Sequence, residues 1–307
     1  MMYVFLIVGF VLLIKGADWF VEGSSAAAKL LKIPPLIIGL TVVSMGTSLP
    51  EASVSISAAI AGKNELAVSN AVGSNIFNLM VVCGVCAAIC PLSINKETLK
   101  RDFPISILAA GLLLGLGAVG MSVGHIDGAV LLGVFIAFLF LMVSSARKAR
   151  QEADEEYKAM PVWKLLVYMI VGIAAIVGGG KMVVSGASDI AREFGMTENL
   201  IGMTIVAFGT SLPELVTSVV AARKKEVDMA VGNVVGSNIF NILFVLGAAA
   251  AISPIAFSME NIIDTIVLIV MTAIVMVFCF KKKELSRVHG WLMLAMYAAY
   301  TAYIFIR

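Results

Sequence analysis

Charged residues are scarce in this chain. Asp, Glu, Lys and Arg make up 14% of its 307 residues, whereas water-soluble domains carry about a quarter. Hydrophobic residues make up 60%, and the mean hydropathy is +1.01. This composition excludes a soluble globular domain and indicates a polytopic membrane protein in contact with a lipid bilayer. We expect no nucleic-acid partner.

Cysteine and histidine are also few. The four cysteines lie in apolar segments, so they indicate no disulfide framework, and we interpret them as small packing residues: Cys83, Cys86, Cys90 and Cys279. The two histidines, His125 and His289, fall near the ends of expected helices. The sequence contains no His-Glu-x-x-His motif, which argues against an intramembrane zinc protease. We expect no enzyme activity.

Long polar linkers are lacking, since the longest polar connection runs from Arg147 to Met160. A hydrocarbon core of about 30 Å needs about 20 helical residues to cross it. Apolar runs of that length predict ten transmembrane helices, near residues 2–27, 36–62, 66–91, 103–123, 127–146, 162–190, 199–222, 227–253, 261–280 and 288–306. We therefore expect an all-α integral membrane fold with short loops.

Two stretches of the chain are nearly identical. Gly46-Thr-Ser-Leu-Pro-Glu51 recurs as Gly209-Thr-Ser-Leu-Pro-Glu214, and the offset 214 − 51 is 163. Gly73-Ser-Asn-Ile-Phe-Asn78 recurs as Gly236-Ser-Asn-Ile-Phe-Asn241 at the same offset, since 236 − 73 is 163. Such ungapped self-similarity indicates an internal duplication.

The duplication predicts two inverted repeats. Each repeat holds five expected helices, an odd number, so the second repeat crosses the membrane in the opposite direction. We place the repeats at residues 1–146 and 162–307, with motif regions at 38–84 and 201–247 and a cytoplasmic linker at 147–161. Inverted repeats with matching motifs are typical of secondary transporters, although a channel stays open on this ground alone.

The basic residues indicate how the chain lies in the cell membrane. With an extracytoplasmic N-terminus, seventeen Lys and Arg residues fall in cytoplasmic loops, and only Lys63, Arg192 and Arg307 fall outside. Because cytoplasmic loops carry the excess of basic residues, this count predicts that both termini are extracytoplasmic.

Each Gly-Thr-Ser-Leu-Pro-Glu motif brings hydroxyls close to a carboxylate. On a continuous helix Thr47 and Ser48 would share a face with Glu51. Pro50 lacks an N–H and crowds the carbonyl of Gly46, so the helix should bend or open there. Unpaired carbonyls at mid-membrane depth are tolerated where they line a polar cavity or meet an ion. The second copy repeats the pattern with Thr210, Ser211, Pro213 and Glu214.

The next helix of each repeat adds further oxygen atoms. Ser74 and Asn78 are four residues apart, as are Ser237 and Asn241. Carboxylate, hydroxyl and amide oxygens suit Ca²⁺ and Na⁺ and serve copper or zinc poorly. Two glutamates carry two negative charges, which one Ca²⁺, or Na⁺ ions or protons, would neutralise. A purely structural role for an intramembrane Glu is disfavoured when the whole constellation occurs twice.

These motifs resemble the two alpha repeats of the calcium/cation antiporter superfamily, and the chain is most similar to its compact prokaryotic sodium/calcium exchangers. The resemblance spans all ten expected helices. It implies an antiporter that exchanges Na⁺ for Ca²⁺ by alternating access and extrudes Ca²⁺, without a cofactor, and we expect a monomer. It also implies the ion ligands: the carboxylates Glu51 and Glu214; the side chains Thr47, Ser48, Ser74, Asn78, Thr210, Ser211, Ser237 and Asn241; and backbone carbonyls at Ser44 and Ala207.

Two details of the motifs bear on the branch within this superfamily. Asn241 stands where potassium-dependent relatives have Asp, which argues against a K⁺ requirement. Thr47 and Thr210 favour sodium, because the proton-coupled branch usually shows Gly-Asn-x-x-Glu. Ca²⁺/H⁺ exchange and K⁺-dependent Na⁺/Ca²⁺ exchange stay open as alternatives, and a cation channel is less favoured. The segment from Gln151 to Glu156 lacks EF-hand spacing and is interpreted as a solvated acidic linker.

The first helix of each repeat carries a glycine stripe with a seven-residue spacing: Gly9, Gly16 and Gly23, then Gly172, Gly179 and Gly186. Such stripes permit close backbone approach. The alternatives are static packing, or sliding of the two helices on these faces past a core of the second, third, seventh and eighth helices. Lys15, Asp18 and Glu22 are expected to pair or snorkel, or to line an ion vestibule, and Lys181 is interpreted in the same way.

Overall fold

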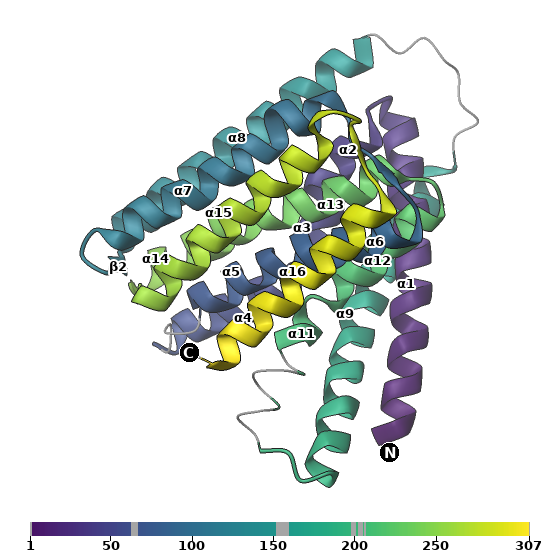
Figure 1. The fold of residues 1–307 in the computed structure, drawn as a ribbon. Helices are drawn as coiled ribbons and strands as arrows, with labels where there is room; N and C mark the ends of the chain where they lie inside the picture. Colours follow the sequence, from purple (N-terminus) through teal and green to yellow (C-terminus); the bar gives the residue numbers. More distant parts are fainter. Residues whose placement is uncertain are drawn as a thin grey trace.

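The structure is a computed structural model that describes residues 2–62, 67–151, 160–197, 201, 205 and 207–306. Long apolar helices make up most of these residues, and Figure 1 shows them packed side by side in a tilted bundle. The two longest helices, α1 (Met2–Leu31) and α9 (Val162–Glu193), run beside each other at one side of the bundle.

The remaining helical elements include several π-helical turns, labelled η. The first half contains α2 (Pro35–Ile38), η1 (Gly39–Val43), α3 (Ser44–Thr47), α4 (Leu49–Ile60), α5 (Ala67–Phe77), η3 (Asn78–Val82), α6 (Cys83–Ile89), η4 (Thr98–Asp102), α7 (Phe103–Ala118) and α8 (His125–Gln151). The second half contains α11 (Ala207–Thr210), α12 (Leu212–Arg223), α13 (Val227–Phe240), η6 (Asn241–Leu246), α14 (Gly247–Ile252), α15 (Met259–Phe280) and α16 (Arg287–Ile306).

Among the described residues, seven helices are long and apolar enough to cross a membrane. A bent pair, Pro35–Thr47 with Leu49–Ile60, brings the number to eight if it forms one span. The predicted span at 199–222 falls partly outside the described residues, and α16 forms a 20-residue helix that is not among the seven. The structure therefore establishes a helical membrane protein, whereas the count of ten stays a prediction.

Within the described part of the chain, four two-residue strands modify the predicted all-α fold. β1 (Leu92–Ser93) pairs antiparallel with β4 (Glu284–Leu285), and β2 (Ser122–Val123) pairs with β3 (Ile255–Ala256). Each bridge joins a loop of the first half to a loop of the second half. The two bridges therefore tie the halves together at the ends of the helices.

Helix α8 extends into the predicted linker, because it continues through Arg147 to Gln151. The run of Ser, Ala, Arg and Lys at its end contains no helix breaker, so nothing stops the helix at the end of the apolar run. The second long helix, α9, begins at Val162. Most of the predicted acidic linker, residues 152–156, lies outside the described residues.

The glycine stripes of α1 and α9 face each other. A Cβ atom placed on Gly9 would lie 2.9 Å from the backbone oxygen of Gly179, and one on Gly16 would lie 2.8 Å from that of Gly172. Such distances leave no room for a side chain, so the glycines allow the two backbones to touch. The close backbone approach that the stripes predict is thus confirmed, and it lies along the α1–α9 contact. Sliding of these helices stays a prediction.

Aromatic contacts repeat on the two halves of the bundle. Phe77 packs edge-on against Tyr297 with ring centroids 5.7 Å apart, and Phe240 packs edge-on against Phe135 at the same separation. The residues Phe77 and Phe240 occupy equivalent positions of the duplicated motif. The outer helices α16 and α8 thus pack on α6 and α14 in corresponding ways and hold the motif-bearing helices at the centre.

Candidate functional site

The helix that carries the first motif breaks at Ser48. α3 ends at Thr47 and α4 begins at Leu49, with a bend of 50° between the two pieces. Pro50 occupies the first turn of α4, where its missing N–H costs no hydrogen bond. The second copy breaks in the same way at Ser211, between α11 and α12, with Pro213 in the first turn of α12. The predicted opening of both helices is confirmed.

The two glutamates lie in the first turns of the broken helices, Glu51 in α4 and Glu214 in α12, and both are fully buried. Helix N-termini carry partial positive charge and unpaired N–H groups, and both favour an ionised carboxylate there. The broken helices therefore offset part of the cost of burying two acidic groups in an apolar bundle.

Each glutamate is held by the serine of the other motif. Ser48 Oγ donates to Glu214 Oε1 at 2.7 Å, and Ser211 Oγ donates to Glu51 Oε1 at 3.2 Å. The predicted grouping of Ser48 with Glu51 on one helical face is therefore incomplete. The break at Ser48 ends the helical spacing on which that expectation depends and turns the hydroxyl toward the opposite motif.

The two asparagines that end the second motifs, Asn78 and Asn241, are also fully buried. Each is the first residue of a π-helical turn, η3 or η6. Such wide turns are frequent at functional sites. The sequence contains no signal for them, because Asn-Ile or Asn-Leu followed by apolar residues fits an ordinary helix.

Four buried side-chain oxygens of this constellation have no hydrogen-bond partner among the described residues: Glu51 Oε2, Glu214 Oε2, Asn78 Oδ1 and Asn241 Oδ1. Buried polar atoms are normally paired, so four symmetric exceptions need an explanation. These oxygens could hold a cation, because hard oxygen donors are the ligands that Ca²⁺ and Na⁺ prefer. Among the described residues no group of three or more His, Cys, Asp or Glu could hold a metal ion, and any cation here would rely on amides and hydroxyls beside two acids.

The other predicted ligands differ in their hydrogen bonds and in their burial. Thr47 Oγ1 donates to Asn233 Oδ1 at 3.0 Å and keeps lone pairs for an ion. Ser237 Oγ lies 3.5 Å from the carbonyl oxygen of Ser44, a residue that is itself fully buried. Ser74 is buried and Thr210 half-buried. Ala207 begins α11, and its side chain lies outside the described residues.

Three asparagines that were not predicted as ligands form hydrogen bonds beside the site. Asn233 accepts from Thr47 and donates to Ser218 Oγ at 2.9 Å. Asn75 and Asn238 donate to each other's backbone carbonyls, at 2.9 and 3.2 Å. The offset 238 − 75 is again 163, so the duplication itself contained the signal: these asparagines repeat, with the motif, within an apolar run.

Beside the motifs lies a cavity of about 250 Å³ with a mostly apolar lining. Pro50 and Val54 of α4 line it together with Thr210 and Pro213, and Lys181 of α9 borders it. The cavity thus extends from the bends of both broken helices to a basic residue on α9.

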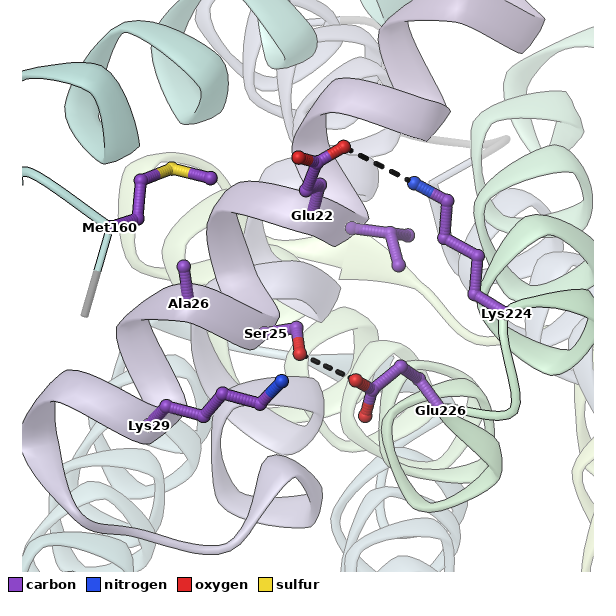
Figure 2. A pocket seen from close by; sticks show the side chains of 8 residues that line it. Glu22, Ser25, Ala26, Lys29, Met160, Lys224 and Glu226 are labelled. Atoms are coloured by element: carbon purple, nitrogen blue, oxygen red, sulfur yellow. Dashed lines mark hydrogen bonds and ion pairs between the residues drawn. The ribbon is translucent and has the colours of Figure 1, made fainter. Parts of the chain in front are cut away.

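A second cavity, of about 430 Å³, lies between α1 and the connection from α12 to α13 (Figure 2). Glu22, Ser25 and Lys29 of α1 face Lys224 and Glu226 across it. Ser25 Oγ donates to Glu226 Oε1 at 2.5 Å, and Lys224 Nζ lies 2.6 Å from Asp18 Oδ1 and 3.6 Å from Glu22 Oε2. The expected pairing of Asp18 and Glu22 is confirmed, with a partner at the end of α12 rather than on their own helix.

A broken-helix membrane bundle with buried, unpaired oxygens at its centre has the architecture of a secondary transporter for cations. Comparison with known proteins gives the family. Residues 1–144 and 164–306 match the sodium/calcium exchanger protein family, and the chain belongs to it.

Individual relatives cover nearly the whole chain. The sodium/calcium exchanger MaX1 of Methanosarcina acetivorans is 30% identical over 99% of this chain and 98% of its own length. Inner membrane protein YrbG of Escherichia coli strain K12 is 39% identical over 81% of this chain and 79% of its own length. The solved structure of the sodium-calcium exchanger NCX_Mj soaked with Na⁺ and Sr²⁺ superimposes with a TM-score of 0.87, at 33% identity, and covers 98% of this chain and 97% of that one.

Proposed function

We propose that this protein is a secondary antiporter that exchanges Na⁺ for Ca²⁺ across a cell membrane. The observation that carries the proposal is the pair of buried glutamates, Glu51 and Glu214, each with one oxygen unpaired. Their two negative charges match one Ca²⁺ or two monovalent cations. Occupancy by one kind of ion excludes the other, and such exclusion couples the two fluxes in an antiporter.

The proposed ligands are the residues that the motifs bring to this centre: Glu51 and Glu214 with Thr47, Ser48, Ser74, Asn78, Thr210, Ser211, Ser237 and Asn241, and the carbonyl oxygens of Ser44 and Ala207. For Asn78 and Asn241, the role as ligands is supported most directly, because their buried amide oxygens have no hydrogen-bond partner among the described residues. No covalent chemistry and no cofactor is required, because transport needs only binding and a change of access.

We further propose ten transmembrane helices in two inverted repeats of five, at residues 1–146 and 162–307. Contacts between the two halves support this arrangement, because each occurs a second time with the repeat-equivalent residues interchanged. Ser48 bonds to Glu214 as Ser211 bonds to Glu51. Asn75 bonds to the backbone of Asn238 as Asn238 bonds to that of Asn75. The excess of basic residues in alternate loops supports extracytoplasmic termini. With the Na⁺ gradient directed inward, the antiporter extrudes Ca²⁺ and works as a monomer.

Uptake of ⁴⁵Ca²⁺ into proteoliposomes tests the function. Vesicles preloaded with Na⁺ are compared with vesicles preloaded with acidic buffer or with K⁺ added, for the wild type and for Glu51→Gln and Glu214→Gln. We expect uptake driven by the Na⁺ gradient alone and abolished by either substitution. Uptake driven by protons would establish Ca²⁺/H⁺ exchange, a requirement for K⁺ would establish the potassium-dependent type, and Ca²⁺ current without a counter-ion would establish a channel.

A further inference from the structure

Asn75 and Asn238 form a reciprocal contact at the centre of the bundle. The side-chain amide of Asn75 donates to the backbone oxygen of Asn238 at 2.9 Å, and that of Asn238 donates to the backbone oxygen of Asn75 at 3.2 Å. Both residues are buried, with at most 1% of their surface exposed. This contact ties α5 to α13 at equivalent points of the two halves.

Asn75 makes one contact that Asn238 does not. Its Oδ1 accepts a hydrogen bond from Asn241 Nδ2 at 3.1 Å. The equivalent bond would join Asn78 to Asn238, but Asn78 Nδ2 and Asn238 Oδ1 have no partner among the described residues. The two halves of the site therefore differ: the amide of Asn241 is held by hydrogen bonding, and that of Asn78 is not.

The contact determines which end of the Asn241 amide is left for an ion. Because Nδ2 is bonded to Asn75, the unpaired atom is Oδ1, which is buried. An amide rotated by 180° would present its NH₂ group instead, and an NH₂ group is a hydrogen-bond donor that repels a cation. The orientation matters at this position more than at a carboxylate, which presents an oxygen either way.

We propose that Asn75 is a positioning residue that keeps the Asn241 amide oxygen available to the transported Ca²⁺. This role rests on the proposed function, in which Ca²⁺ binds between Glu51 and Glu214. Asn75 itself contacts no ion. It acts through the amide of Asn241. Because the equivalent bond to Asn78 is missing among the described residues, this role applies to the second half of the site and not to the first.

A double-mutant cycle separates positioning from a structural role. Asn75→Ala frees the Asn241 amide to rotate, so the Ca²⁺ dissociation constant should rise about five- to ten-fold, the worth of about one hydrogen bond. In an Asn241→Asp background the same substitution should cause no rise, because the bond to Asn75 is already absent and a carboxylate presents an oxygen in either orientation. Equilibrium ⁴⁵Ca²⁺ binding in detergent is measured for the wild type and the three variants of the cycle, and thermal unfolding checks that each is folded.

Asn238→Ala is the matched control, since it removes the corresponding bond to the other backbone but no contact to a ligand amide. We expect its dissociation constant to stay within about two-fold of the wild-type value. Equal losses of affinity from Asn75→Ala in both backgrounds, or from Asn75→Ala and Asn238→Ala alike, would overturn the positioning role. Asn75→Ser repeats the cycle if the alanine variant does not fold. A wild-type protein that binds no Ca²⁺ would instead overturn the proposed function on which the inference rests.

Discussion

Ser48 and Glu214 lie 166 residues apart in the sequence, yet the hydroxyl of Ser48 donates a 2.7 Å hydrogen bond to the carboxylate of Glu214. The opposite bond, from Ser211 to Glu51, measures 3.2 Å. Each carboxylate therefore depends on the other motif for one hydrogen bond and leaves its second oxygen unpaired. The proposed ion site therefore needs residues of both halves.

Ser48→Ala should weaken Ca²⁺ binding. Hydrogen bonds to charged groups contribute about 1.5–3 kcal/mol, so we expect the Ca²⁺ concentration for half-maximal uptake to rise about ten-fold or more. Ser211→Ala should have a smaller effect, because its bond is longer. The control is Ser57→Ala, an exposed serine on α4, for which we expect no change. Equal effects of Ser48→Ala and Ser57→Ala would contradict the assignment.

Asn233 links Thr47 to Ser218, and its removal should destabilise the protein. Asn233→Ala removes the amide that donates to the buried Ser218 hydroxyl, whereas the Thr47 hydroxyl keeps the Ser44 carbonyl at 3.3 Å as a partner. An unsatisfied buried group costs about 1–3 kcal/mol. We expect a lower thermal unfolding temperature in detergent. The repeat-equivalent Asn70→Ala is the comparison, because Asn70 is only partly buried and its bond to Ser55 measures 3.3 Å. A larger loss of stability for Asn70→Ala than for Asn233→Ala would refute this role.

The sequence predicts the broken helices and much of the site because both depend on local chemistry. Proline in a helix must either break it or lie in its first turn. Pro50 and Pro213 lie in first turns, and the breaks occur two residues earlier, at Ser48 and Ser211. The paired motifs likewise predict Glu51 and Glu214 as the central acidic residues, because intramembrane carboxylates are typical of functional sites, and the structure buries both beside the opposite motif.

Contacts between the halves are not predictable from local spacing. The helical rule that places Ser48 beside Glu51 fails at the break, and the hydroxyl bonds to Glu214 instead. The glycine stripes indicate close approach but do not identify the partner, because any helix with small residues can serve. Asn75 and Asn233 escape prediction for the same reason: their role depends on which helices cross beside them, and only the duplication marks them out.

Gly179 should tolerate no side chain, in contrast to its neighbour Gly178. A Cβ atom on Gly179 would lie 2.7 Å from the backbone oxygen of Gly9, whereas one on Gly178 would meet nothing within 4 Å. Gly179→Ala must push α1 and α9 apart, and overpacking of this kind costs about 1–3 kcal/mol. Gly178→Ala should be neutral or stabilise the helix by up to about 1 kcal/mol.

Thermal unfolding in detergent measures both glycine variants, and ⁴⁵Ca²⁺ uptake measured beside it tests the sliding hypothesis. If the two helices move together as one tightly packed pair, Gly179→Ala should also slow exchange while equilibrium Ca²⁺ binding stays nearly intact. Equal stability of the two variants would show that the α1–α9 contact is looser than the structure indicates.

Lys224 joins the end of α12 to α1, and its loss should open the cavity between them. Its ammonium group lies 2.6 Å from Asp18 and also donates to the backbone oxygen of that residue. Partly exposed ion pairs contribute up to about 1 kcal/mol, so Lys224→Met should favour separation of α1 from the end of α12 by up to about five-fold. A cysteine introduced as Ala26→Cys, on the wall of the cavity, reports this opening through its rate of reaction with a membrane-impermeant maleimide.

The maleimide reaction should accelerate in Lys224→Met but not in Arg223→Met. Arg223→Met is the control because it removes a neighbouring positive charge and leaves the ion pairs of Lys224 with Asp18 and Glu22 in place. High salt should produce a similar acceleration in the protein that retains Lys224, because ions screen exposed pairs. An unchanged rate in Lys224→Met would mean that the Ser25–Glu226 hydrogen bond alone holds α1 against this connection. In that case Glu226→Gln, which keeps the shape but weakens the acceptor, should accelerate labelling where Lys224→Met does not.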